Sequence, residues 1–288
     1  MSRERGDRGW LFVLPAGLLV GLLVLLPLTS VLWLSLRHVM PVFGIDRWAG
    51  LANFAHLALD ARFRGSLGTT LYFASVAVSL ELLLGLGLAL VLHRRFKGRG
   101  LARTAALVPW ALPTVVAARL WEWIYNPDFG ILNHLLQQAG LLAGPRSWLG
   151  DPFWALHAAI LADVWKTTPF AALILLAGLA AIPPELERAA QVDGASLITI
   201  LRRIIMPVIM PGLAATALIC FIFSWNEFLF ALRLTGQTAK TAPVFLAGSI
   251  APEGLFLAHL CAVAFVVCLP VLIAGWAAQD KLVRGLSL

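Results

Sequence analysis

A short polar sequence, Trp225, Asn226 and Glu227, stands near the end of a long apolar segment. No residue of opposite charge lies within one helical turn of Glu227. An amide and a carboxylate beside an aromatic ring are the groups that usually hold uncharged sugars in binding sites. The alternative is that these residues pack in the core or contact another helix.

Charged residues also occur in pairs inside apolar segments, where charge is costly and usually faces a cavity or another charge. Asp163 and Lys166 are three residues apart, as are Arg119 and Glu122, and this spacing permits an ion pair on a helix. Mutual neutralisation is one interpretation of each pair. A place along a substrate pathway is the other interpretation of Asp163 and Lys166. Glu81, the only charge in its segment, is expected to bond to another helix or subunit.

The elements that carry these residues are predicted to be membrane-spanning helices. Mean hydropathy is +0.86 and only 13% of residues are charged, which excludes an ordinary soluble domain. Segments of about 20 apolar residues cross a bilayer as helices, because backbone groups must be paired within the segment. The expected fold is all-α, a polytopic membrane protein with one domain over residues 1–288. The six expected spans are 10–36, 67–92, 104–125, 153–181, 207–232 and 256–278, with a cytoplasmic loop at 182–206.

Lysine and arginine counts predict the orientation of these spans. The two tails, the segment after the second span and the loop 182–206 hold 13 such residues, and the alternate loops hold 7. Positive residues favour the cytoplasmic side, so both termini are expected in the cytoplasm. This topological charge accounts for most of the net charge of +7, and no nucleic-acid partner is expected.

Sequence signatures of enzymes and cofactor sites are absent from the sequence. It contains no GxxxxGK[ST], HExxH or GxSxG sequence and no cluster of cysteine and histidine. Cys220, Cys261 and Cys268 lie inside expected spans and are interpreted as packing residues. We therefore expect no catalytic residues, no metal site and no cofactor.

The loop has a composition of its own, "ELERAAQVDGASLITILRRIIMPVIMP" over residues 185–211. Pro183 and Pro184 favour the start of a short helix, Asp193 and Gly194 favour a turn, and Ser196 can cap a second helix. An apolar stripe then recurs at helical spacing, at Leu197, Ile200, Leu201, Ile204 and Ile205. A helix pair lying on lipid headgroups is one interpretation, and docking into a groove of another protein is the other.

This loop resembles the EAA loop of permease subunits in bacterial binding-protein-dependent ABC importers. The resemblance rests on Ala189 and Ala190, on Asp193-Gly194-Ala195, and on Ile204 and Pro207. Arg188 stands where the family has glutamate, with Glu187 one residue earlier, and Met206 stands for the usual leucine. Other stretches resemble the maltose-transporter type of permease: "LPAGLLVGLLVLLPLTSVLWLSL", "GLANF", "LVPWALPTVVAARLWEWIYNPDFGILN" and "DVWKTTPFAALILLAGLAAIPPELERAA". "SWNEFLFAL" is found more often in the partner permease class.

The resemblance implies a coupling helix that docks onto a separate ATPase. The residues expected to couple to it are Glu185, Glu187, Arg188, Ala189, Ala190, Asp193, Gly194 and Ala195. The implied partners are a second homologous permease, a cytoplasmic ATPase dimer, and an extracytoplasmic sugar-binding protein or lipoprotein, in the inner membrane. The implied cargo is a disaccharide such as trehalose or maltose. Glycerol 3-phosphate or another polyol remains an alternative, as does a stand-alone secondary transporter or membrane enzyme.

Overall fold

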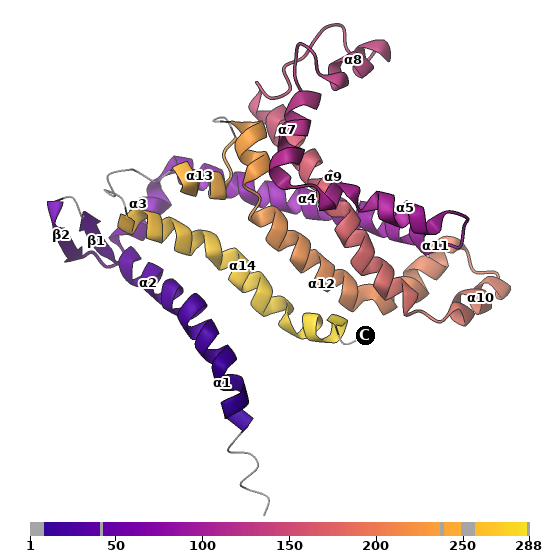
Figure 1. Ribbon diagram of the computed structural model, residues 1–288, viewed down its shortest axis with the longest axis horizontal. Coiled ribbons are helices and arrows are strands. Elements are labelled where there is room, and N and C mark those ends of the chain that lie inside the picture. The colour runs from indigo at the N-terminus through magenta and orange to yellow at the C-terminus, as the bar shows by residue number, and fades with distance from the viewer. Residues whose placement is uncertain (1–8, 41–42, 237–238, 249–256, 287–288) are drawn as a thin grey trace, which may run out of the picture. The chain divides into compact units, whose positions relative to one another are not determined.

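The computed structural model describes residues 9–40, 43–236, 239–248 and 257–286. Within these ranges it describes every side chain except those of residues 9–11, 187 and 280–286. The described elements are α1 (Gly9–Val20), η1 (Gly21–Leu25), α2 (Leu26–Ser35), β1 (Arg37–Met40), β2 (Ile45–Trp48), α3 (Ala52–Leu59), α4 (Ala61–His93), α5 (Arg99–Ala106), α6 (Val108–Ala111), α7 (Thr114–Ile124), α8 (Ile131–Gln138), α9 (Pro152–Ala180), α10 (Pro184–Val192), α11 (Leu197–Ile200), η3 (Leu201–Ile205), α12 (Met206–Trp225), η4 (Ala231–Thr235), α13 (Ala242–Gly248) and α14 (Leu257–Leu286) (Figure 1).

The expected all-α membrane fold is confirmed. Five helices are long and apolar enough to cross a membrane, and a bent helix pair makes a sixth candidate among the described residues. The structure adds a small, unpredicted β-hairpin, in which Arg37 pairs with Trp48 and Met40 with Ile45. The described parts of residues 1–65 and 245–269 form one compact unit, and those of 66–244 and 270–288 form a second.

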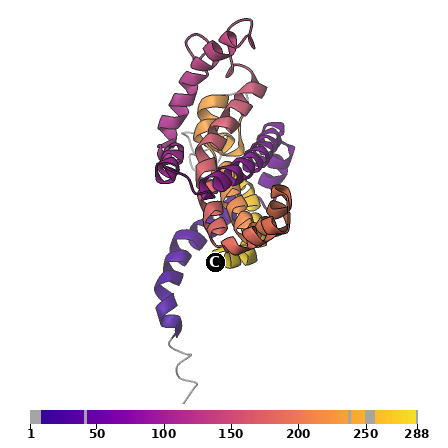
Figure 2. The same cartoon turned by 90° about the vertical axis from the view of Figure 1, so that its right-hand side faces the viewer.

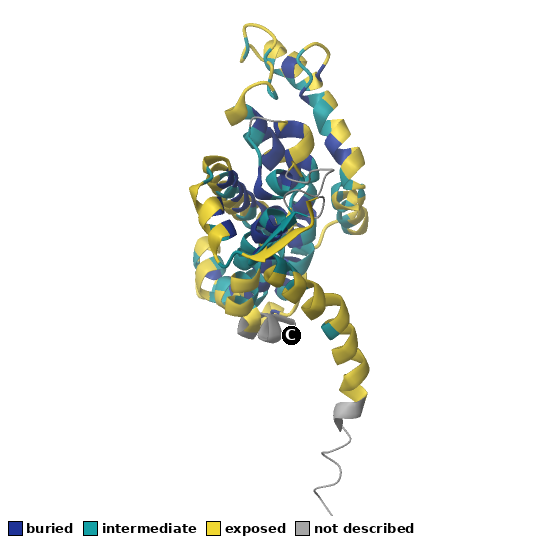
Figure 3. Ribbon diagram, turned by 90° about the vertical axis from the view of Figure 1, so that its left-hand side faces the viewer, coloured by how far each residue is buried: buried dark blue, intermediate teal, exposed yellow. Residues whose placement is uncertain are grey.

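In the first unit, Asn53 joins the end of α2 to the hairpin. Its Nδ2 donates to the backbone oxygens of Ser35 at 2.7 Å and Arg37 at 2.8 Å. Phe63 and Phe245 also pack in this unit, with ring centroids 5.7 Å apart. The described side chains of α1 are exposed, and so are most of those of α2 (Figure 3). An apolar helix without a protein covering suits contact with lipid or another subunit.

In the second unit, α4, α9 and α12 lie side by side (Figures 1 and 2). Small residues bring the helices close together: a Cβ added at Gly85 of α4 would lie 3.0 Å from the Cβ of Ala171 on α9. One core cluster surrounds Phe73 and Phe230. A second joins α4 and α9 to the loop 182–206 and includes Leu175 and Ile205. The second unit therefore holds both the candidate site and the loop.

The third expected span, 104–125, is divided between two helices. Residues Arg99–Ala111 and Thr114–Ile124 are bent by 90° relative to one another. Leu112 is extended between them, and Pro113 caps the second helix. Proline restricts the preceding residue to extended backbone and has no N–H to continue the ladder, which explains the break.

The fifth expected span, 207–232, has different limits in the structure. The helix starts at Leu197, continues through η3 into α12, and ends at Trp225. The π-helical turn before Pro207 accommodates the proline, which lies in the first turn of α12. The other observed spans are Phe12–Ser35, Ala61–His93, Pro152–Ala180 and Leu257–Gln279, and position 256 of the expected sixth span lies outside the described residues.

Candidate functional site

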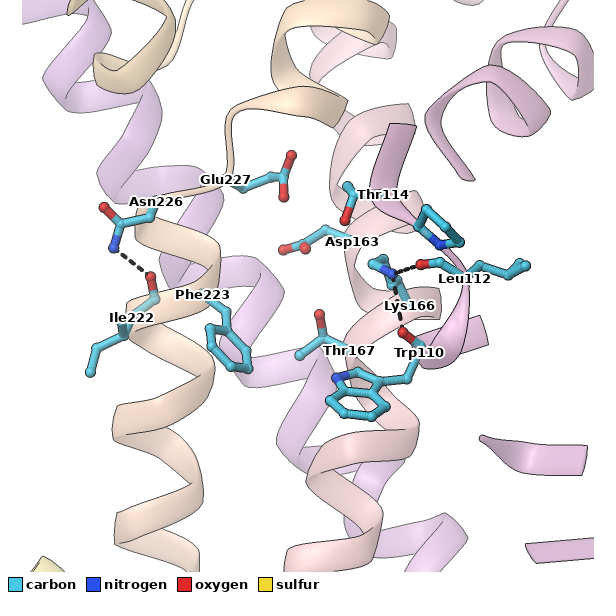
Figure 4. A pocket seen from close by; sticks show the side chains of 11 residues that line it. Trp110, Leu112, Thr114, Asp163, Lys166, Thr167, Ile222, Phe223, Asn226 and Glu227 are labelled. Atoms are coloured by element: carbon cyan, nitrogen blue, oxygen red, sulfur yellow. Dashed lines mark hydrogen bonds between the residues drawn. The ribbon is translucent and has the colours of Figure 1, made fainter. Parts of the chain in front are cut away.

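A cavity of about 530 Å³ lies in the second unit, between the break in the third span, the middle of α9 and the end of α12 (Figure 4). Such a volume is in the usual range of small-molecule sites. Its lining residues are Trp110, Leu112, Pro113, Thr114, Asp163, Lys166, Thr167, Ile222, Phe223, Asn226 and Glu227.

Asp163 lies at the centre of a polar contact among three helices. It is 3% exposed, and its Oδ2 accepts a hydrogen bond of 3.0 Å from the Ser224 hydroxyl of α12. The same hydroxyl lies 3.4 Å from Oε1 of Glu81 on α4, which is fully buried. The expectation that Glu81 bonds to another helix is thus met. Glu81 lies behind Asp163 and does not line the cavity.

Lys166 does not form the expected ion pair with Asp163. Its Nζ instead donates to the backbone oxygens of Trp110 at 3.2 Å and Leu112 at 2.5 Å (Figure 4). The break in the third span leaves carbonyls without helical partners, and Lys166 supplies a donor to two of them. The other expected pair does form, with 2.8 Å between Arg119 Nη1 and Glu122 Oε2.

The polar sequence at the end of α12 is divided between cavity and core. Asn226 and Glu227 line the cavity. Glu227 Oε1 accepts from the backbone N–H of Phe230 at 2.6 Å, and Asn226 Nδ2 donates to Ile222 O at 2.8 Å. Trp225, which we expected beside the substrate, is 2% exposed and packs against Phe221. Trp225 is not among the residues that line the cavity, and its burial agrees with the alternative interpretation of a core residue.

Two other aromatic residues line the cavity, and sequence analysis did not identify either. Trp110 comes from α6 and stacks on Phe170 of α9, with ring centroids 5.4 Å apart and planes 13° apart. Phe223 comes from α12 and lies 5.6 Å from the same Phe170 ring. The two prolines around Trp110, Pro109 and Pro113, were the signal for an irregular segment there.

The loop 182–206 has the predicted local structure. The helix α10 begins at Pro184, Gly194 has a left-handed φ of +76°, and the Ser196 hydroxyl accepts from the Thr199 N–H. Ile200 and Ile205 of the apolar stripe are buried in the core cluster with α4 and α9. Leu197 departs from the expected stripe because it is exposed.

Of the residues expected to couple to an ATPase, some are exposed and others pack in the core. Glu185, Arg188, Ala189, Asp193 and Gly194 are exposed. Ala190 and Ala195 pack against the chain's own core, since they face the stripe. The side chain of Glu187 lies outside the described residues. Four large apolar residues of the loop are exposed and were not predicted as contacts: Leu186, Val192, Leu197 and Ile198.

Comparison with known families gives one match that covers most of the chain. Residues 81–285 match the family described as binding-protein-dependent transport system inner membrane component. The trehalose/maltose transport system permease protein MalF of Thermococcus litoralis is 40% identical over 228 residues, which cover 79% of this chain and 77% of the relative. The trehalose transport system permease protein SugA of Mycobacterium tuberculosis is 38% identical over 240 residues, 83% of this chain and 76% of the relative.

The fold is also similar to solved structures. A chain of a bacterial alginate ABC transporter, in complex with an alginate pentasaccharide-bound periplasmic protein, superimposes with a TM-score of 0.76 at 22% identity. The match covers 96% of this chain and 93% of the other. At this identity the likeness concerns the fold.

Proposed function

The chain belongs to the family of binding-protein-dependent transport system inner membrane components, and from this premise we propose which solute it carries and how it is driven. It is a transmembrane permease of the sugar ABC transporter type. The proposed cargo is an uncharged disaccharide of the trehalose or maltose kind. The proposed pathway runs through the cavity between the break in the third span, α9 and α12.

The chemistry of the cavity carries this proposal. Asp163 and Glu227 offer carboxylate acceptors, Asn226 offers an amide, and Thr114 and Thr167 offer hydroxyls. Trp110 and Phe223 add aromatic surface. Carboxylates and amides beside aromatic rings match a ligand with many hydroxyl groups and apolar ring faces.

Charge favours a neutral sugar over glycerol 3-phosphate. Two carboxylates face the cavity, from Asp163 and Glu227. The Lys166 ammonium is directed at two backbone carbonyls. A phosphate in this cavity would meet two acidic side chains and one ammonium group that already bonds to carbonyls. The names of the relatives at 40% and 38% identity, which refer to trehalose and maltose, support the same choice.

We further propose that the loop 182–206 docks onto a cytoplasmic ATPase, through the exposed residues of α10 and its turn. Both termini are placed on the same side, on the charge count of 13 to 7. The charge count also places the loop 182–206 and the basic segment after α4 on one side. Ala102 and Ala106, at the end of that basic segment, support this placement because they pack against the same core as Ile200. A second permease and an extracytoplasmic sugar-binding protein complete the proposed assembly, and the exposed α1 and α2 are available for a neighbouring subunit.

Transport by the purified assembly tests the proposal. The permease, its partner permease, the ATPase and the binding protein are reconstituted in vesicles that contain ATP. Uptake is measured for trehalose, maltose and glycerol 3-phosphate. We expect ATP-dependent uptake of a disaccharide and none of the phosphate ester. Uptake of glycerol 3-phosphate alone would assign the polyol alternative, and uptake by the single chain without ATP would contradict the importer.

A further inference from the structure

The break in the third span creates a need for hydrogen-bond donors. The helix α6 ends at Ala111, Leu112 is extended, and Pro113 has no N–H. The carbonyls at a helix C-terminus have no partners within the helix, and an unpaired carbonyl in a membrane is strongly unfavourable. A donor must therefore come from another element.

Lys166 of α9 is that donor. Its ammonium group bonds to the oxygens of Trp110 and Leu112, on both sides of the end of α6 (Figure 4). One helical turn further along α9, Phe170 stacks on the ring of Trp110. The two contacts fix both the backbone and the side chain of the same short segment against one face of α9. Trp110, Leu112, Pro113 and Thr114 of this segment line the cavity.

The helix 99–111 also reaches the core beneath the loop 182–206. Ala102 and Ala106 pack against the cluster that includes Ile200 and Ile205. The helices α5 and α6 follow one another from Arg99 to Ala111, up to the break. One end of this helix thus lies against the loop proposed to dock on the ATPase, and the other end forms a wall of the cavity.

We propose that Lys166 is a positioning residue that anchors helix 99–111 to α9, so that a movement of the loop 182–206 reaches the wall of the sugar cavity. Lys166 acts through the backbone of the break and is not a sugar ligand. The coupling part of this inference rests on the proposed function. The anchor itself rests on the contacts of Lys166 and Phe170 alone.

The test compares Lys166→Met, which removes the donor and keeps the stem, with Lys166→Arg, which keeps donors. Lys97→Met, at an exposed position, is the matched control. Spin labels at Leu101 on α5 and Leu161 on α9, both exposed, report the distance between the two helices in the assembled complex in lipid nanodiscs. Basal and sugar-stimulated ATP hydrolysis are measured on the same samples.

Lys166→Met should broaden the distance distribution and lower sugar-stimulated hydrolysis about tenfold, because two carbonyls lose their donor. Lys166→Arg should restore both readouts, and Lys97→Met should equal wild type in the distance distribution and in basal and sugar-stimulated hydrolysis. A narrow distribution in Lys166→Met, or failure of Lys166→Arg to restore it, would overturn the anchor.

A second variant keeps the test decisive if Lys166→Met does not assemble. Phe170→Leu retains the ammonium group and removes the stacked ring, so it should broaden the same distribution, and an unchanged distribution would overturn the proposal. A wild-type complex that no tested sugar stimulates would contradict the proposed function, while the label distances still test the anchor.

Discussion

The Ser224 hydroxyl of α12 donates a hydrogen bond of 3.0 Å to Asp163 of α9, so one buried contact orients a carboxylate at the cavity. Ser224→Ala should free that carboxylate and leave a buried acceptor without its partner, at a cost of about 1–3 kcal/mol. We expect a raised KM for sugar uptake and a lower melting temperature. Ser79→Ala is the control, because the Ser79 hydroxyl bonds only within its own helix. Equal KM values and equal melting temperatures for Ser224→Ala and Ser79→Ala would show that the hydrogen bond from Ser224 to Asp163 has no role.

Trp110 and Trp225 should respond differently to the same substitution. Trp110→Ala removes aromatic surface from the cavity, so sugar uptake should weaken while the complex still assembles. Trp225→Ala empties a buried site and should cost roughly 3–5 kcal/mol of stability. Melting temperature and uptake are compared for both, with Trp123→Ala at an exposed position as the control. Loss of assembly in Trp110→Ala together with normal uptake in Trp225→Ala would contradict the assignment of Trp110 to the cavity and Trp225 to the core.

Gly194 has a φ of +76° and open space around the position of a Cβ. A substitution there is therefore strained by backbone conformation and not by collision. Gly194→Val should cost about 1 kcal/mol or more. Gly194→Asn should be milder because asparagine adopts this conformation more readily. We expect the valine variant to hydrolyse ATP without coupled uptake, or to lose the ATPase on purification. Normal coupling in Gly194→Val would indicate a surface turn without a docking role.

Val192 is the most exposed apolar residue of the loop 182–206, with 88% of its surface accessible. If an ATPase groove covers it, Val192→Asp should weaken co-purification of the ATPase about tenfold or more, as expected for a buried anchor at an interface. Gln191→Asp places the same charge one residue away on the exposed loop. The permease should stay folded in both variants. Comparable ATPase recovery from both would place the interface elsewhere.

Sequence reasoning was most successful where local backbone chemistry decides the structure. Gly194, Ser196 and Pro184 each act within a few residues of the chain, and each has the predicted conformation or cap. It was less successful where neighbouring helices decide which face is covered. Trp225 is buried and Ala190 packs against the chain's own core, and no single-helix pattern contains that information.

The contacts of Lys166 depend both on local backbone chemistry and on packing between helices. Its spacing from Asp163 permits an ion pair, yet Lys166 bonds to the carbonyls of Trp110 and Leu112 at the break instead. Pro113 signalled an irregularity, but the 90° bend that brings Trp110 to Lys166 depends on packing against α9. The amide and carboxylate of the cavity could thus be predicted from Asn226 and Glu227. Its aromatic residues, Trp110 and Phe223, could not.

Protection of the cavity by sugar tests directly whether the cavity is part of the sugar pathway. Thr114→Cys is introduced at the cavity wall of a permease whose three native cysteines are replaced, and the full complex is assembled in lipid. The rate of reaction with a small polar thiol reagent is measured with and without trehalose or maltose, beside Thr104→Cys, which lies outside the cavity. We expect a transported disaccharide to slow labelling of Thr114→Cys severalfold and to leave labelling of Thr104→Cys unaffected. Equal labelling rates with and without a disaccharide that the same complex transports would contradict the assignment of this cavity to the sugar pathway.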